Sequence, residues 1–115
     1  EKETISDLDK GFVSRFKSLV EERMKDAELN VEDLGRNMGM SRVQLYRKLK
    51  SLTNYSPNEL LRQMRLKKAA SLLASSDMTV AEIAYEVGFS SPSYFTKCYK
   101  EQFGESPTEF LKRRG

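Results

Sequence analysis

One stretch of this chain occurs twice. The pattern of apolar, small, glycine and basic residues in residues 29–56 returns in residues 78–106. Matching positions lie 49 residues apart as far as Ser41 and Ser90, and 50 residues apart from Leu45 and Phe95 onward. The second copy therefore has one extra residue near the start of its second helix. A repeat of this length marks a supersecondary unit that is used twice. The chain is therefore expected to fold as two related units.

Each copy begins with the signals of a short helix that stops at a sharp turn. Asn30 and Thr79 precede short apolar runs and have an acidic residue three positions later, as in a capping box. Gly39 and Gly88 follow, where a sharp turn needs a positive φ. Gly35 and Ala84, matched small residues, allow two helices to cross closely. A second helix, capped by Ser41 or by Ser90 or Ser91, is predicted over residues 42–52 and 92–103.

The rest of the chain is helical in pattern as well. Apolar spacing predicts a helix over residues 9–26 after a linker of residues 1–8. Two further helices are predicted to begin at Pro57 and at Pro107. Each proline follows a serine that can cap the helix and precedes, by two positions, a glutamate that completes a capping box. The second helices are expected to face inward with Leu45, Leu49 and Leu52 in one copy and Phe95, Tyr99 and Phe103 in the other, and to end at Asn54 and Gly104.

Together these elements predict an all-α fold of seven helices without strands. A short capped helix, a glycine turn and a second helix with a basic outward face describe a helix-turn-helix. Two matched occurrences make this a strong prediction. The predicted division is a first helix-turn-helix subdomain at residues 9–56, a long connector helix at 57–75 and a second helix-turn-helix subdomain at 76–115.

The charge distribution points to a polyanionic partner. The net charge is only +3, but residues 41–75 hold eight lysines and arginines against Glu59 alone. Such a patch is typical of a surface that binds nucleic acid, although a solvated helical face has the same composition.

The outward stripe of the first recognition helix suits the major groove of DNA. Arginine can donate two hydrogen bonds to guanine, so Arg47 is predicted to contact a base. Val43 is expected against a thymine methyl group, and Tyr46 is expected to hydrogen-bond or pack. Arg42 and Lys50, at the helix ends, are predicted to contact phosphates.

The matching stripe of the second recognition helix carries less charge. Its predicted base-facing residues are Pro92, Ser93, Thr96 and Lys97, and Lys100 is predicted to contact a phosphate. Lys97 aligns with Arg47, and a lysine offers less for bidentate recognition. The first unit is therefore expected to contribute more affinity and more specificity.

The connector helix sets the spacing. Its 18 residues from Pro57 to Ala74 span about 27 Å, against about 34 Å between successive major grooves on one side of the duplex. Arg62 and Arg65, with Lys67 and Lys68, are predicted to contact the intervening phosphates. For Arg65 the alternative is burial against a carboxylate.

These residues also carry a family resemblance. The sequence resembles the DNA-binding domain of AraC/XylS-type transcription regulators in Gly39-Met-Ser-Arg-Val-Gln-Leu-Tyr-Arg-Lys-Leu-Lys50, Ile83-Ala-Tyr-Glu-Val-Gly-Phe-Ser90 and Phe103-Gly-Glu-Ser-Pro107. The resemblance implies a cytoplasmic bacterial regulator that binds double-stranded promoter DNA in two adjacent major grooves, with RNA polymerase as a partner. It also implies a sensing or dimerisation domain outside this chain.

A second resemblance concerns Leu45-Tyr-Arg-Lys-Leu-Lys50. These residues are similar to the C-terminal output domain of hybrid two-component sensors in Bacteroidetes. The resemblance implies that the acidic first residues are the end of a linker from a receiver domain.

Other functional classes are less compatible with the sequence. The chain has no histidine, so a Ser-His or Cys-His nucleophile pair and a histidine metal site are impossible, and neither an enzyme nor a cofactor is expected. Cys98, the single cysteine, excludes an intrachain disulfide, favours a reduced setting and is expected in the core. No run of 18 apolar residues and no signal peptide is present, and the basic stripes lack the apolar neighbours that membrane contact needs. A helical module that binds an acidic protein remains an alternative.

Overall fold

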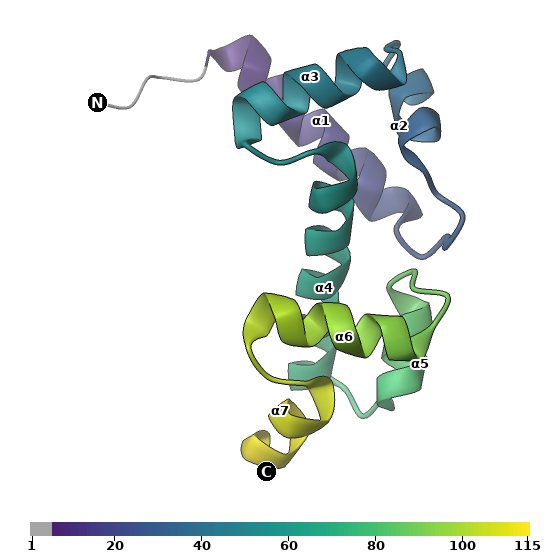
Figure 1. Cartoon of the computed structure of the whole chain (residues 1–115), viewed down its shortest axis with the longest axis vertical. Helices are drawn as coiled ribbons and strands as arrows, with labels where there is room; N and C mark the ends of the chain where they lie inside the picture. Colours follow the sequence, from purple (N-terminus) through teal and green to yellow (C-terminus); the bar gives the residue numbers. More distant parts are fainter. Residues whose placement is uncertain (1–5) are drawn as a thin grey trace. The chain divides into compact units, whose positions relative to one another are not determined.

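The computed structural model describes residues 6–115 and has seven helices and no strand within them (Figure 1). The helices are α1 (Asp7–Arg23), α2 (Val31–Asn37), α3 (Arg42–Thr53), α4 (Pro57–Ser75), α5 (Val80–Glu86), α6 (Pro92–Phe103) and α7 (Pro107–Arg114). The predicted all-α fold is confirmed. No helix of residues 6–115 is long and apolar enough to cross a bilayer.

The bounds of α1 differ from the predicted ones at both ends. Ser6 caps the helix, because its hydroxyl accepts the backbone N–H of Asp9 at 3.1 Å and its carbonyl accepts that of Lys10 at 2.9 Å. Asp7 and Leu8, assigned to a linker, are therefore helical, and the rest of that predicted linker, residues 1–5, lies outside the described residues. The helix ends at Arg23, three residues before the predicted end at Asp26.

The helices form two compact units. Among the described residues, the first contains residues 6–23 and 29–61, and the second contains residues 24–28 and 62–115. The segment 24–28 between α1 and α2 thus packs with residues that are much later in the sequence. Helix α4 contributes its first turn to the first unit and the remainder to the second.

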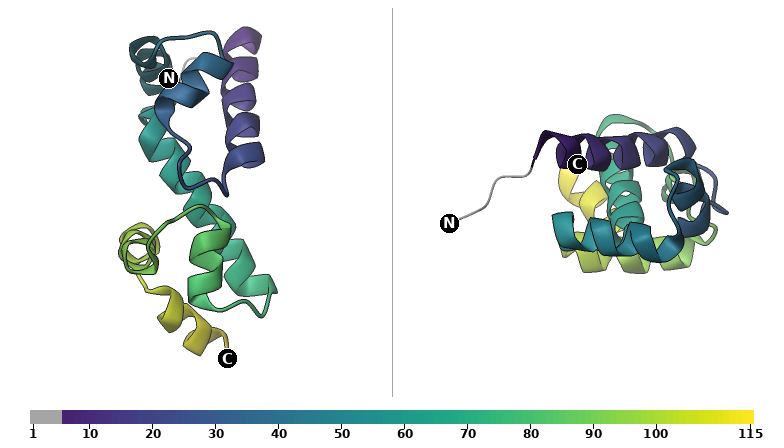
Figure 2. Two further views of the ribbon diagram at one scale, coloured as in Figure 1. Left: turned by 90° about the vertical axis from the view of Figure 1, so that its right-hand side faces the viewer. Right: turned by 90° about the horizontal axis from the view of Figure 1, so that it is seen from above.

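The first unit is organised around side chains that are fully removed from solvent. Phe16 and Val20 of α1, Leu34 of α2, and Leu45 and Leu49 of α3 are each 0% exposed. Burying one such side chain contributes about 1.5–3 kcal/mol. In the left view of Figure 2, α1 lies on one side of this unit and α3 on the other, so the outer face of α3 is left uncovered.

The core of the second unit is partly aromatic. Its buried residues are Leu66, Ala69, Leu73, Ile83, Ala84, Val87, Phe89, Phe95, Cys98 and Tyr99. The ring centroids of Phe89 and Phe95 lie 5.2 Å apart in an edge-on arrangement that aromatic pairs favour. The predicted inward position of Phe103 is wrong, since its side chain is 40% exposed. Phe103 is the last residue of α6, and it lies at the edge of the core. The centroids of its ring and the Tyr99 ring are 4.6 Å apart.

Candidate nucleic-acid interface

The predicted caps position the short helices α2 and α5. The side chain of Asn30 accepts the backbone N–H of Asp33 at 2.9 Å. Thr79 and Glu82 form a complete capping box, with reciprocal hydrogen bonds of 3.1 and 2.8 Å. The Asp33 carboxylate bonds to Arg36. Both predicted helix starts are confirmed.

The two turns that lead into α3 and α6 have the same hydrogen bonds. Met40 N–H donates to the carbonyl of Gly35 at 2.8 Å, and Phe89 N–H donates to the carbonyl of Ala84 at 2.9 Å. Gly39 and Gly88 have φ values of +69° and +99°, as predicted. At Gly35 a Cβ atom would lie 2.7 Å from the carbonyl oxygen of Met40, so the small residue is required there.

Serine residues then start both recognition helices. Ser41 forms a capping box with Gln44, and Ser91 caps α6 by accepting the backbone N–H of Tyr94 at 3.2 Å. Asn54 and Gly104 end these helices in the left-handed conformation, at φ values of +70° and +83°. The start and end of each recognition helix thus follow from local sequence signals that match in the two copies.

The structure places the predicted stripe of α3 on the surface. Arg42, Val43, Tyr46, Arg47 and Lys50 are all exposed. Val43 is 56% and Tyr46 is 47% exposed, whereas Leu45 and Leu49 on the other face of the helix are fully buried. Two large hydrophobic side chains held in water next to arginines suit a surface that binds a partner with both apolar and anionic groups.

A shallow depression adjoins this stripe. It has a volume of about 450 Å³ and is lined by Val31, Arg42, Val43, Tyr46, Arg47, Ser56, Pro57 and Asn58. Asn58 was not singled out from the sequence, although it lies in the first turn of the helix that follows α3. The tight turn at Asn54 brings that first turn close to the stripe, which places an amide side chain close to Arg42.

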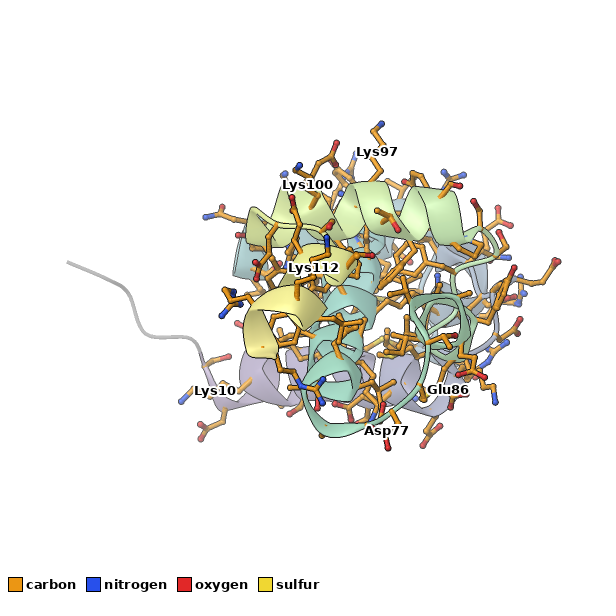
Figure 3. The ribbon with its side chains drawn as sticks, turned by 90° about the horizontal axis from the view of Figure 1, so that it is seen from below. Lys10, Asp77, Glu86, Lys97, Lys100 and Lys112 are labelled. Carbon is orange, nitrogen blue, oxygen red and sulfur yellow. The ribbon has the colours of Figure 1, made fainter. Side chains whose placement is uncertain are left out.

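The stripe of α6 is less uniform. Ser93, Lys97 and Lys100 are exposed, whereas Pro92 and Thr96 are half-buried. Figure 3 shows Lys97 pointing away from α6, on the opposite side of this unit from Asp77 and Glu86. The α6 side of this unit thus presents Lys97 away from these two carboxylates, which favours an anion there.

Tyr94 is an exposed residue of α6 that the sequence reasoning missed. Its side chain is 52% exposed, and its ring lies 6.0 Å from that of Phe89. A hydrogen bond with Cys98 raises the pKa of the Tyr94 phenol above its ordinary value. The helical period places Tyr94 beside Lys97, one turn along α6, and this was the available signal.

The two lysines near the ends of the recognition helices are both near a capping glutamate. Lys50 Nζ lies 3.9 Å from Oε1 of Glu59, which also accepts the backbone N–H of Ser56 at 2.8 Å. The backbone hydrogen bond from Ser106 and the charge of Lys100 together lower the pKa of Glu109. Each predicted phosphate contact is thus partly compensated by a carboxylate.

Two other basic side chains of the patch at residues 41–75, Lys48 and Arg65, have internal partners. Lys48 Nζ lies 3.6 Å from the carboxylate of Asp9 and 5.1 Å from the ring centre of Phe12. Arg62 is exposed. The guanidinium of Arg65 donates to the backbone carbonyls of Met24 and Asp26, at 3.2 and 2.8 Å. The predicted phosphate contact of Arg65 is therefore corrected, because two of its five N–H donors are directed into the protein. Its partners are backbone carbonyls, whereas the predicted alternative was burial against a carboxylate.

Known proteins share this architecture. Residues 34–113 match the family described as "Helix-turn-helix domain". The chain is 37% identical over 96% of its length to Histidine kinase P4 of Formosa agariphila, of which it spans 8%, and it spans 29–37% of other curated relatives.

Two solved structures agree with this match. The C-terminal domain of AraT, a response regulator from Geobacillus stearothermophilus, is 27% identical with a TM-score of 0.83, over 96% of this chain and 88% of that one. The DNA-binding domain of AdpA, solved in complex with a target DNA, is 30% identical with a TM-score of 0.82, over 88% of this chain and 90% of that one. With its two matched helix-turn-helix units, the chain belongs to the AraC-type family of helix-turn-helix DNA-binding domains.

Proposed function

We propose that this chain binds double-stranded DNA at a specific sequence, with α3 and α6 in adjacent major grooves. The observation that carries the proposal is the pair of exposed recognition-helix faces, each held by a glycine turn with the same hydrogen bonds. A helix fits the major groove of B-DNA, where each base pair presents a distinct pattern of donors and acceptors. In this assignment residues 9–56 and 76–115 are the two DNA-reading subdomains, and residues 57–75 connect them.

The proposed contacts divide into those that read bases and those that bind phosphates. The base contacts are Val43, Tyr46, Arg47, Pro92, Ser93, Thr96 and Lys97. The phosphate contacts are Arg42, Lys50, Arg62 and Lys100. Arg47 is the principal reader, because its exposed guanidinium can bind two acceptors of one guanine.

The surroundings of the domain follow from its family. We propose a transcription regulator that acts at a promoter in the bacterial cytoplasm and contacts RNA polymerase. A sensing or dimerisation domain outside this chain would control it. The similarity to Histidine kinase P4 and to the response regulator AraT supports an output domain of a two-component system. A binding function also fits a chain without histidine better than catalysis does.

Selection of bound sequences from a random DNA pool tests the proposal. Two conserved blocks about one helical turn apart are expected, with the stronger block opposite α3. A plot of the logarithm of the binding constant against the logarithm of the salt concentration should then have a negative slope. Each neutralised phosphate should contribute about 0.9 to that slope. Recovery of no common sequence, together with an affinity that salt does not change, would reject DNA binding and favour an acidic protein partner.

A further inference from the structure

Arg65 is the residue of α4 whose guanidinium turns into the second unit. It is half-buried, and its Nε and Nη2 atoms donate to the carbonyls of Met24 and Asp26. Burial lowers the pKa of Arg65, and the charge of Asp26 acts in the opposite direction. Arginine stays protonated in proteins, so this is a half-buried charged group, and backbone oxygens accept two of its five N–H donors. Arg62, one turn earlier in the same helix, is exposed.

The carbonyl of Met24 also lies against the turn between α5 and α6. A Cβ atom on Gly88 would be 2.0 Å from the Met24 oxygen and 2.7 Å from Nε of Arg65. The backbone of the turn at Gly88 therefore lies directly against the Met24 carbonyl and the Arg65 guanidinium. Only glycine leaves room for these two groups. On the surface beside them, Lys25 Nζ lies 3.2 Å from the carboxylate of Glu86, the last residue of α5.

The corresponding turn of the first unit is held differently: Nη2 of Arg15 in α1 donates to the carbonyl of Asn37, the last residue of α2, at 2.8 Å. Gly39 also has a positive φ, of +69°, but nothing lies within 4 Å of the position of its Cβ atom. The two turns share their internal hydrogen bonds, from Met40 to Gly35 and from Phe89 to Ala84. They differ in that backbone from more than 60 positions earlier in the sequence packs directly on Gly88, whereas nothing packs on Gly39.

We propose that Arg65 is a positioning residue for the second DNA-reading helix. It holds residues 24–28 against the turn at Gly88 and thereby fixes the conformation from which α6 starts. The second reader accordingly consists of the helix-turn-helix together with residues 24–28. The consequence for DNA recognition rests on the proposed function, whereas the support of the turn does not.

Amide hydrogen exchange tests the support of the turn without DNA. In Arg65→Met, the amide of Phe89 should exchange about tenfold faster or more, because a charged hydrogen-bond donor to the segment is lost. The amide of Met40, its counterpart in the first unit, should keep its rate. Equal rates at Phe89 in the variant and the parent protein would overturn the proposal.

Lysine at position 65 separates positioning from phosphate binding. Arg65→Lys keeps the positive charge and lacks the fork of donors that reaches two carbonyls. In Arg65→Lys the amide of Phe89 should therefore exchange as fast as in Arg65→Met. Base preference should flatten in the block of the DNA site opposite α6. The salt dependence of binding should stay that of the parent protein. Restored base preference in Arg65→Lys, or a salt slope reduced by about 0.9 in Arg65→Met, would identify Arg65 as a phosphate contact. Arg62→Met is the control, and it should show that reduced slope with unchanged exchange at Phe89.

A glycine pair keeps the proposal testable if Arg65→Met does not fold. Gly88→Ala adds a methyl group against Met24 and Arg65 at a φ of +99°, whereas Gly39→Ala adds one in open space at a φ of +69°. Gly88→Ala should speed exchange at Phe89 by more than Gly39→Ala speeds exchange at Met40. Equal effects would show that the segment does not support the turn. If selection from the random DNA pool recovers no common sequence, the amide-exchange results still decide whether Arg65 supports the turn at Gly88.

Discussion

Lys50 Nζ lies 3.9 Å from Oε1 of Glu59, across the turn that joins α3 to α4. Glu59 has a second task there, because its carboxylate also accepts the backbone N–H of Ser56 and caps α4. A lysine predicted to contact DNA is thus partly neutralised by the residue that starts the next helix. In the second unit Glu109 likewise accepts the backbone N–H of Ser106, and the charge of Lys100 helps to lower its pKa.

Replacing the carboxylate with an amide should therefore strengthen DNA binding. Glu59→Gln keeps a capping acceptor for Ser56 and removes the charge next to Lys50. Since an exposed ion pair contributes about 0.2–1 kcal/mol, we expect affinity to rise roughly one-and-a-half- to fivefold at low salt. Titration at two salt concentrations measures this. Glu59→Ala, which loses the cap as well, should be less stable, and an unchanged affinity in Glu59→Gln would show that Lys50 does not contact the DNA.

Arg47 should carry base recognition by the first unit. We expect Arg47→Ala to cost about 1–3 kcal/mol on the selected site and to flatten the preference at one base pair. Lys97→Ala, at the matching position of α6, should cost less, because lysine binds as a point charge. Competition against sequences mutated one position at a time measures both effects. Equal weakening on every sequence would instead assign Arg47 to a phosphate.

Two glycines in helices should respond oppositely to alanine. At Gly35 the added Cβ would meet the carbonyl of Met40 at 2.7 Å, so Gly35→Ala should destabilise the fold by about 1–3 kcal/mol. Gly11 in α1 has nothing within 4 Å, and Gly11→Ala should stabilise by about 0.5–1 kcal/mol. Urea unfolding of both variants compares them. A stable Gly35→Ala protein would mean that α2 and its turn can separate at no cost.

Acid should weaken the attachment of α7 through one ion pair. Arg113 donates two hydrogen bonds to the carboxylate of Glu105, at 3.2 and 2.6 Å, and these bonds lower the pKa of Glu105. A group whose pKa is lowered by folding stabilises above its unfolded pKa, near 4.3, and this stability is lost as the pH falls through the folded pKa. Stability measured from pH 7 to pH 3 should fall less in Glu105→Gln than in the parent protein. Parallel curves would exclude Glu105 as a source of the pH dependence.

The sequence determined most of the fold because its signals act over a few residues. Caps at Asn30, Thr79 and Ser41, glycines at the turns and the helical period of apolar residues all act within about one turn of helix. The caps and turn glycines act through local hydrogen bonds and dihedral angles, and the apolar period marks the face that each helix buries. The helix order and the bounds of α6 could therefore be predicted, and so could the exposed face of α3.

Only the tertiary structure decided which basic side chains are available to a partner. Arg62 and Arg65 are alike in the sequence, but Arg65 bonds to carbonyls 41 and 39 positions away. Lys48 likewise reaches Asp9. Such pairings depend on how the chain brings distant segments together, and a local pattern carries no record of them. The sequence by itself thus determined two helix-turn-helix units, and the packing determined that the second turn is held by residues 24–28.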